Sequence, residues 1–256
     1  MKINAAVLTA FLFFTALPIV LLVWWKRRSG AKLLCFFTGA LCFIVFAMLL
    51  ESLLHAYCLQ GDNRFSRFLL GSPAAYVLYA SLAAGLFEET GRLFAYRLLL
   101  RRQRESACAV AYGIGHGGIE VWLLVGINYA LILLAQLGVS LGSGVTAQML
   151  AAAEAIRFPV AGVAMLERVS AMMLHIGLSM IVFVAARQRG RLWLYPLAIL
   201  LHALVDAPAA LYQFQGTPPV AVVEIVAFLG GLAYLVLGKK LLDQYRASEA
   251  EAVDPA

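Results

Sequence analysis

Residues 3–28 read INAAVLTAFLFFTALPIVLLVWWKRR, an apolar run that ends in three basic residues. A run of about 20 apolar residues is long enough to cross the hydrocarbon core of a bilayer as a helix. A cleaved signal peptide would end in small residues at its cleavage site, not in a basic cluster. We therefore expect a retained first transmembrane helix, and the rest of the chain repeats its pattern.

Six further apolar runs follow, at 33–57, 74–99, 106–135, 160–186, 192–213 and 220–238. Hydrophobic residues make up 63% of the 256 residues and charged residues 13%, with a mean hydropathy of +0.87. Soluble domains are much less apolar. The sequence predicts an all-α, polytopic transmembrane bundle of about seven helices in an inner (plasma) membrane. Residues 1–246 would form one transmembrane domain, and 247–256 a disordered cytoplasmic tail.

Basic clusters follow every second apolar run, at 26–32, 101–104, 187–191 and 239–240. Because basic loops are retained in the cytoplasm, this pattern predicts the N-terminus outside and the C-terminus in the cytoplasm. The connection 136–159 would then lie outside, as a short surface helix. The net charge of +6 is explained by these clusters and does not indicate a nucleic-acid partner.

The four cysteines show no disulfide framework. Cys35 and Cys42 lie seven residues apart in one apolar run and are expected to be small packing residues. Cys58 and Cys108 are expected on opposite sides of the membrane, where they cannot pair.

Four predicted spans carry ionisable residues near the middle of the membrane. Each lies about 11 to 13 positions from a basic flank, or roughly 16–20 Å along a helix. They are Glu88 and Glu89, His116, His175 and His202. An ionisable group in hydrocarbon is costly unless it is paired or hydrated, so positions at one depth predict one polar site between helices. Glu51 and His55 lie nearer the outer end of their run and are expected at the membrane interface.

The glutamate pair precedes Arg92 by four and three residues, so all three side chains can meet on one helix. The arginine can neutralise one carboxylate and leave the other as a general base. We expect this base to be Glu89, with Glu88 as the alternative.

Three more carboxylates are expected to support the histidines. Glu120 and Asp206 follow His116 and His202 by four residues, and Glu167 precedes the histidine of the fifth run on the same helix. Catalytic and metal-binding histidines are usually oriented by such partners.

Two mechanisms fit this set of residues. In the first, His116, His175 and His202 bind zinc, with Glu89 as an optional further ligand, and a glutamate takes the proton of the bound water. In the second, no metal takes part and a glutamate activates water directly. The spacing does not separate them. The sequence contains no HExxH, which excludes a zincin-type motif.

Four motifs together resemble the YhfC family of intramembrane metalloproteases, which is similar to the CAAX-prenyl and bacteriocin-processing membrane proteases. They are Glu88-Glu89-x-x-Arg92, His116-x-x-x-Glu120, Glu167…His175 and His202-x-x-x-Asp206. The resemblance implies that Glu88, Glu89, Arg92, His116 and His202 are catalytic. Two residues separate the second glutamate from the arginine, where the wider group usually has three.

We therefore expect an intramembrane peptidase that hydrolyses a peptide bond of a membrane-associated protein or peptide. Its partners would be membrane lipid and that substrate, and its cofactor zinc if the first mechanism applies. The alternative is a proton- or cation-coupled transporter that uses the same Glu, His and Asp residues as a relay. Against this alternative, the sequence shows no clear inverted repeat and no pair of proline-broken helices.

Overall fold

The computed structural model describes residues 3–253, and these residues are helical nearly throughout, with no strand among them. The long helical segments are α1 (Ala5–Ser29), α2 to η2 (Leu33–Gln60), α5 with η3 (Pro73–Leu99), α6 to α7 (Ala107–Gln136), α9 (Phe158–Arg187), α10 (Leu194–Gln215) and α11 (Val220–Val253). Six of them are long and apolar enough to cross a membrane. The third reaches this only together with α4 (Arg64–Leu70), from which it bends by 106°. The predicted polytopic all-α bundle is confirmed.

Several long segments contain π-helical turns, which often occur at functional positions. The second segment consists of α2 (Leu33–Cys42), η1 (Phe43–Glu51), α3 (Ser52–His55) and η2 (Ala56–Gln60). The third consists of α5 (Pro73–Phe94) and η3 (Ala95–Leu99), and the fourth of α6 (Ala107–Glu120), η4 (Val121–Gly126) and α7 (Ile127–Gln136). Two of the turns lie beside carboxylates, because η1 ends at Glu51 and η4 begins directly after Glu120.

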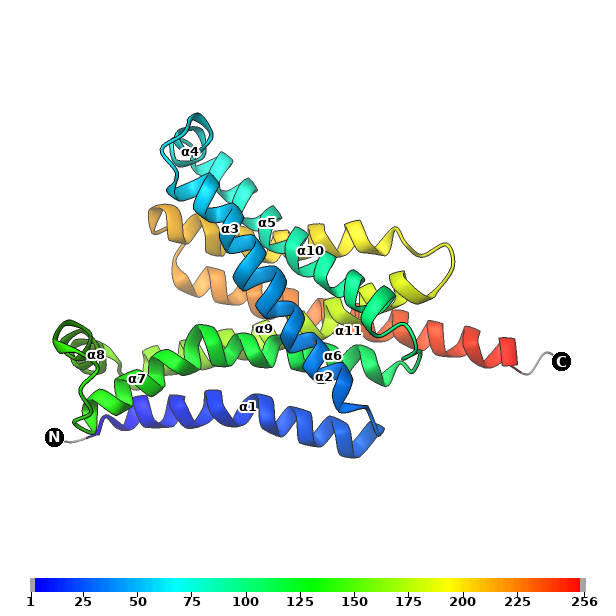
Figure 1. Cartoon of the computed structure of the whole chain (residues 1–256), viewed down its shortest axis with the longest axis horizontal. Helices are drawn as coiled ribbons and strands as arrows, with labels where there is room; N and C mark the ends of the chain where they lie inside the picture. The colour runs from blue at the N-terminus through cyan, green and yellow to red at the C-terminus, as the bar shows by residue number, and fades with distance from the viewer. Residues whose placement is uncertain (1–2, 254–256) are drawn as a thin grey trace.

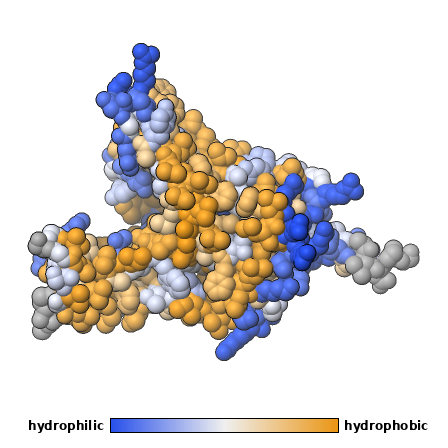
Figure 2. Space-filling view, viewed as in Figure 1, coloured by the Kyte–Doolittle hydropathy of each residue, from blue (hydrophilic) through white to orange (hydrophobic). Residues whose placement is uncertain are grey.

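The helices form two groups that cross in the middle of the molecule (Figure 1). In one group α1, α6–α7, α9 and α11 lie side by side, and in the other α5 packs against α10 and η1. The groups meet where α2 contacts α6 and α10 contacts α9, and they spread apart toward α4 and α8. Figure 2 shows hydrophobic atoms along the sides and hydrophilic atoms at the two ends, as expected for a membrane-spanning bundle.

The short helix α8 (Ser143–Ala155) forms within the connection predicted to hold a surface helix, at the same end as the N-terminus (Figure 1). Asn4 joins the two regions. Its side-chain oxygen accepts from the N–H of Ala6 and Val7 and caps α1, while its Nδ2 donates to the carbonyl oxygens of Ala153 and Ile156 at 2.6 and 2.8 Å. The side of the membrane on which this end lies stays a prediction.

Glycines let α6 approach its neighbours closely. An added Cβ at Gly115 would overlap the carbonyl oxygen of Phe36 in α2, and one at Gly113 would lie 2.6 Å from the Cα of Ile176 in α9. Small residues at helix interfaces allow such close backbone contact in membranes. The glycine-rich sequence around His116 therefore places this histidine between α2 and α9.

Replacing Gly115 by alanine is expected to destabilise the bundle by about 1–3 kcal/mol, because α2 would have to move away. Gly162→Ala is the matched control: it lies in α9 with no atom within 4 Å of an added Cβ, so it should leave stability unchanged or raise it slightly. Unfolding of both variants in mixed detergent micelles checks this. Equal stability of the two would contradict the packing described for α6.

One local prediction differs from the structure. Cys35 and Cys108 form a disulfide, with their Cα atoms 5.5 Å apart across 73 residues of sequence, so the expectation of no disulfide is wrong. The packing of α2 on α6 creates this neighbourhood, which the sequence spacing does not reveal. The tail predicted at 247–256 stays a prediction: α11 is described to Val253, and 254–256 lie outside the described residues.

Candidate active site

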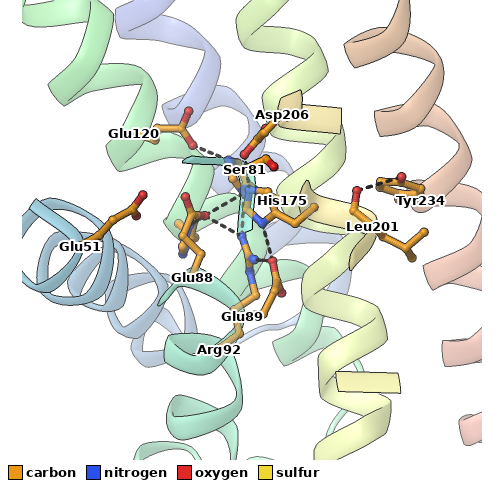
Figure 3. A network of polar contacts seen from close by, with 12 residues as sticks. Glu51, Ser81, Glu88, Glu89, Arg92, Glu120, His175, Leu201, Asp206 and Tyr234 are labelled. Carbon is orange, nitrogen blue, oxygen red and sulfur yellow. Dashed lines mark hydrogen bonds and ion pairs between the residues drawn. The ribbon is translucent and has the colours of Figure 1, made fainter. Parts of the chain in front are cut away.

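The ionisable residues predicted at one depth come together between four helices, and Figure 3 shows part of this network. Glu88, Glu89 and Arg92 lie on α5, His116 and Glu120 on α6, His175 on α9, and His202 and Asp206 on α10. All except Asp206 are buried, at 8% exposure or less. Charged groups in such an interior are stable only when they are paired, and each of these has a charged or imidazole partner.

Arg92 lies at the centre of the network. Its side chain is fully buried, and its Nη1 donates to Oε1 of Glu89. Its Nη2 lies 3.5 Å from Oε2 of Glu88 and 2.6 Å from Nδ1 of His175. Because a guanidinium only donates, His175 accepts at Nδ1 and carries its proton on Nε2, which faces Glu120. One arginine thus contacts both glutamates and sets the tautomer of one histidine.

The two adjacent glutamates have different surroundings. Glu89 has no exposed surface and is enclosed by Arg92 and by Nδ1 of His202, which lies 2.7 Å from its Oε1. Oε2 of Glu88 lies 2.8 Å from Nε2 of His116, and the Glu88 side chain lines a cavity. Of the two carboxylates, Glu88 is thus the one that lines a cavity, whereas the sequence interpretation preferred Glu89 as the base.

Two cavities reach this network from different directions. The first has a volume of about 480 Å³ and lies between η1, α3, α5 and α10. The second, of about 160 Å³, lies between α9, α10 and α11. Glu88, Glu120 and Asp206 line both, whereas neither lining includes Glu89 among the described residues. The two cavities thus meet Glu88 from different sides.

The expected supporting carboxylates form partly different pairs. Asp206 lies 3.3 Å from Nε2 of His202 on its own helix. Glu120 contacts Nε2 of His175 on α9, although the sequence suggested the histidine four residues before it. Glu167 does not contact His175 but pairs with the neighbouring Arg168. Partner choice across helices depends on helix rotation, which the spacing within one helix does not reveal.

Arg168 is a site residue that the sequence interpretation missed. It is buried, and its Nη1 donates to Oε1 of Glu120 at 2.8 Å. It therefore holds the carboxylate that in turn contacts His175. The sequence does contain an indication of this position, because Arg168 lies two helical turns before His175 and on the same face of α9.

One group in the network has the donors of a metal site. Ligand atoms of Glu88, His116 and His175 lie within 4.8 Å of one another, and all three residues are buried. The predicted three-histidine set differs by one member, because Glu88 takes the place of His202 in this group. Two imidazoles and one carboxylate are a known catalytic zinc set, so these residues fit the ion by type.

Comparisons with known proteins agree with the motifs. The family model described as YhfC intramembrane metalloprotease matches residues 13–227. The chain is also similar to a protein of Bacillus subtilis (strain 168) described as an uncharacterized membrane protein YhfC. The two are 38% identical over 229 residues, which cover 83% of this chain and 86% of the relative. No solved structure matches the chain.

Proposed function

This chain belongs to the YhfC intramembrane metalloprotease family, and from that premise we propose that it is a membrane peptidase whose reaction centre is the Glu88–His116 pair. It would hydrolyse a peptide bond of a membrane-associated protein or peptide in the plasma membrane. The family match lends no support to the transporter alternative.

One observation carries this proposal. Glu88 is a buried carboxylate that is hydrogen-bonded to His116 at 2.8 Å, and it lines two cavities. A hydrolase needs a proton acceptor, a place for water and a route for the substrate within a space shielded from bulk solvent. Glu88 meets these requirements, whereas the enclosed Glu89 does not.

The proposed reaction uses the residues of this chain in a simple order. Glu88 takes a proton from a water molecule that His116 holds in place, and the water oxygen bonds to the carbonyl carbon of the substrate. The carbon–nitrogen bond then breaks, and Glu88 returns the proton to the leaving amine. Arg92 holds Glu89 and His175 in position beside this centre.

Glu88, His116 and His175 would hold a zinc ion. Bound zinc would lower the pKa of its water and polarise the substrate carbonyl. A carboxylate has two oxygens, so Glu88 can offer one to an ion and keep the other as a proton acceptor. Its role in proton transfer is therefore compatible with a metal.

Metal content of the purified protein tests this assignment without an activity assay. We expect about one zinc per chain in the wild type, and a loss of at least roughly tenfold in metal affinity in His116→Ala and His175→Ala, because each removes a ligand. His202→Ala should retain the metal, since its ring faces carboxylates outside the group. Equal loss of metal in all three variants would instead support the three-histidine site predicted from the sequence. Full retention of metal in all three would argue against any metal at this position.

The peptidase function itself can be tested without a known substrate. Membranes containing the wild type or Glu88→Gln are compared by mass spectrometry of protein N-termini. We expect new termini within or beside transmembrane segments only with the wild type. Identical termini in both samples, together with ion flux in proteoliposomes, would favour a transporter instead.

A further inference from the structure

A second polar cluster lies in the first cavity, away from the reaction centre. Glu51, at the end of η1, is only 8% exposed and lines the same cavity as Glu88. The sequence places it near the membrane interface, and that depth stays a prediction, but its side chain is buried inside the molecule. Figure 3 shows its side chain on the η1 segment, apart from the network that contains Glu88.

This carboxylate contacts His55, whose ring is in turn held by Tyr79. Its Oε1 lies 3.2 Å from Nε2 of His55, and Nδ1 of the same ring lies 2.8 Å from the hydroxyl of Tyr79 on α5. The chain Glu51–His55–Tyr79 thus joins two walls of the cavity. A carboxylate oriented by such partners is preorganised to bind a ligand, because little side-chain freedom is lost on binding.

The charge of the cavity lining is one-sided. Its ionisable members are Glu51, Glu88, Glu120 and Asp206, with His55 as the one nitrogen base, and no lysine or arginine among the described residues contributes. The negative charges of Glu88 and Glu120 are balanced by ion pairs with Arg92 and Arg168. The described contacts give Glu51 an imidazole partner but no guanidinium or ammonium.

Glu51 therefore has no full positive charge as a partner among its described contacts, and it lines a cavity that a cationic side chain could enter. We propose that Glu51 is the recognition subsite for a lysine or arginine side chain of the peptide that is cleaved at Glu88, an inference that rests on the proposed peptidase function. A buried carboxylate stabilises such a cation strongly and rejects an anion, because the surrounding interior screens charge poorly. The apolar residues of the lining, including Phe43, Met48 and Leu59, would contact the hydrophobic part of the same segment.

Binding measurements test this subsite separately from catalysis. Glu88→Gln in lipid nanodiscs serves as the parent, so that bound peptide is not consumed. The probes are fluorescent apolar helical peptides with one lysine at successive positions, and matched peptides with norleucine or glutamate there. In at least one position, lysine should bind about tenfold more tightly than norleucine, as expected for one charge-assisted hydrogen bond. The glutamate peptide should bind most weakly.

Adding Glu51→Gln to the parent should abolish the preference for lysine and leave the affinity for the norleucine peptide unchanged, which also reports a correct fold. Glu51→Asp should keep the preference. The matched control is Glu224→Gln, because Glu224 is a carboxylate of the second cavity and not of the first. The Glu224→Gln variant should keep the preference for lysine.

Three results would overturn the subsite: no preference for lysine at any position, a preference that survives Glu51→Gln, or one that Glu224→Gln removes equally. Failure of the peptidase proposal looks different. In that case the wild type would bind the lysine peptide selectively but never cleave it.

Discussion

Glu88→Gln is expected to lower the rate of peptide hydrolysis by about 10²–10⁴-fold, the usual contribution of a general base. Glutamine keeps the size of the side chain and a hydrogen bond to His116, but it cannot take a proton from water at neutral pH. The thermal unfolding temperature should change little, because Glu88 already faces a cavity and Arg92 retains Glu89. Cleavage of a quenched fluorescent membrane peptide, measured with the unfolding temperature of the same sample, checks both parts.

Two matched variants sharpen this result. Glu224→Gln, in the second cavity, should remain close to wild-type activity. Glu89→Gln should lose stability together with activity, since Glu89 is enclosed by Arg92 and His202. Full activity in Glu88→Gln would remove Glu88 from the mechanism. A Glu89→Gln protein that is stable and yet inactive would return the role of base to Glu89.

Arg92→Met is expected to destabilise the bundle by about 3–5 kcal/mol, the range for removing one partner of a buried ion pair. The methionine fills similar space, so the loss is mainly electrostatic. It leaves two adjacent carboxylates in the interior with only imidazoles as partners. Unfolding in mixed detergent micelles measures the change in free energy.

The double variant Glu89→Gln/Arg92→Met separates charge from packing. Removing Glu89 together with its partner should recover part of the lost stability, because fewer uncompensated charges stay buried. Losses that simply add would mean that Arg92 acts through packing alone. Wild-type stability in Arg92→Met would contradict the central position of this arginine in the network.

The sequence was sufficient to predict the transmembrane bundle and the polar residues that come together inside it. Hydropathy identifies each span, and the rise per residue converts the distance from a basic flank into depth. Glu88, Glu89, His116, His175 and His202 were found in this way, and the structure brings them together. Both properties are encoded within single helices, so no knowledge of neighbouring helices is required.

Only the tertiary structure decided which of these residues contact one another. Successive residues on a helix differ in direction by about 100°, so helix rotation decides that Glu88 faces the cavities while Glu89 faces Arg92 and His202. The same packing turns Glu120 toward His175 and brings Cys35 to Cys108. A residue's depth depends on its own helix, but the direction it faces depends on how the other helices pack. That packing is set by contacts distant in sequence, such as Gly115 against Phe36.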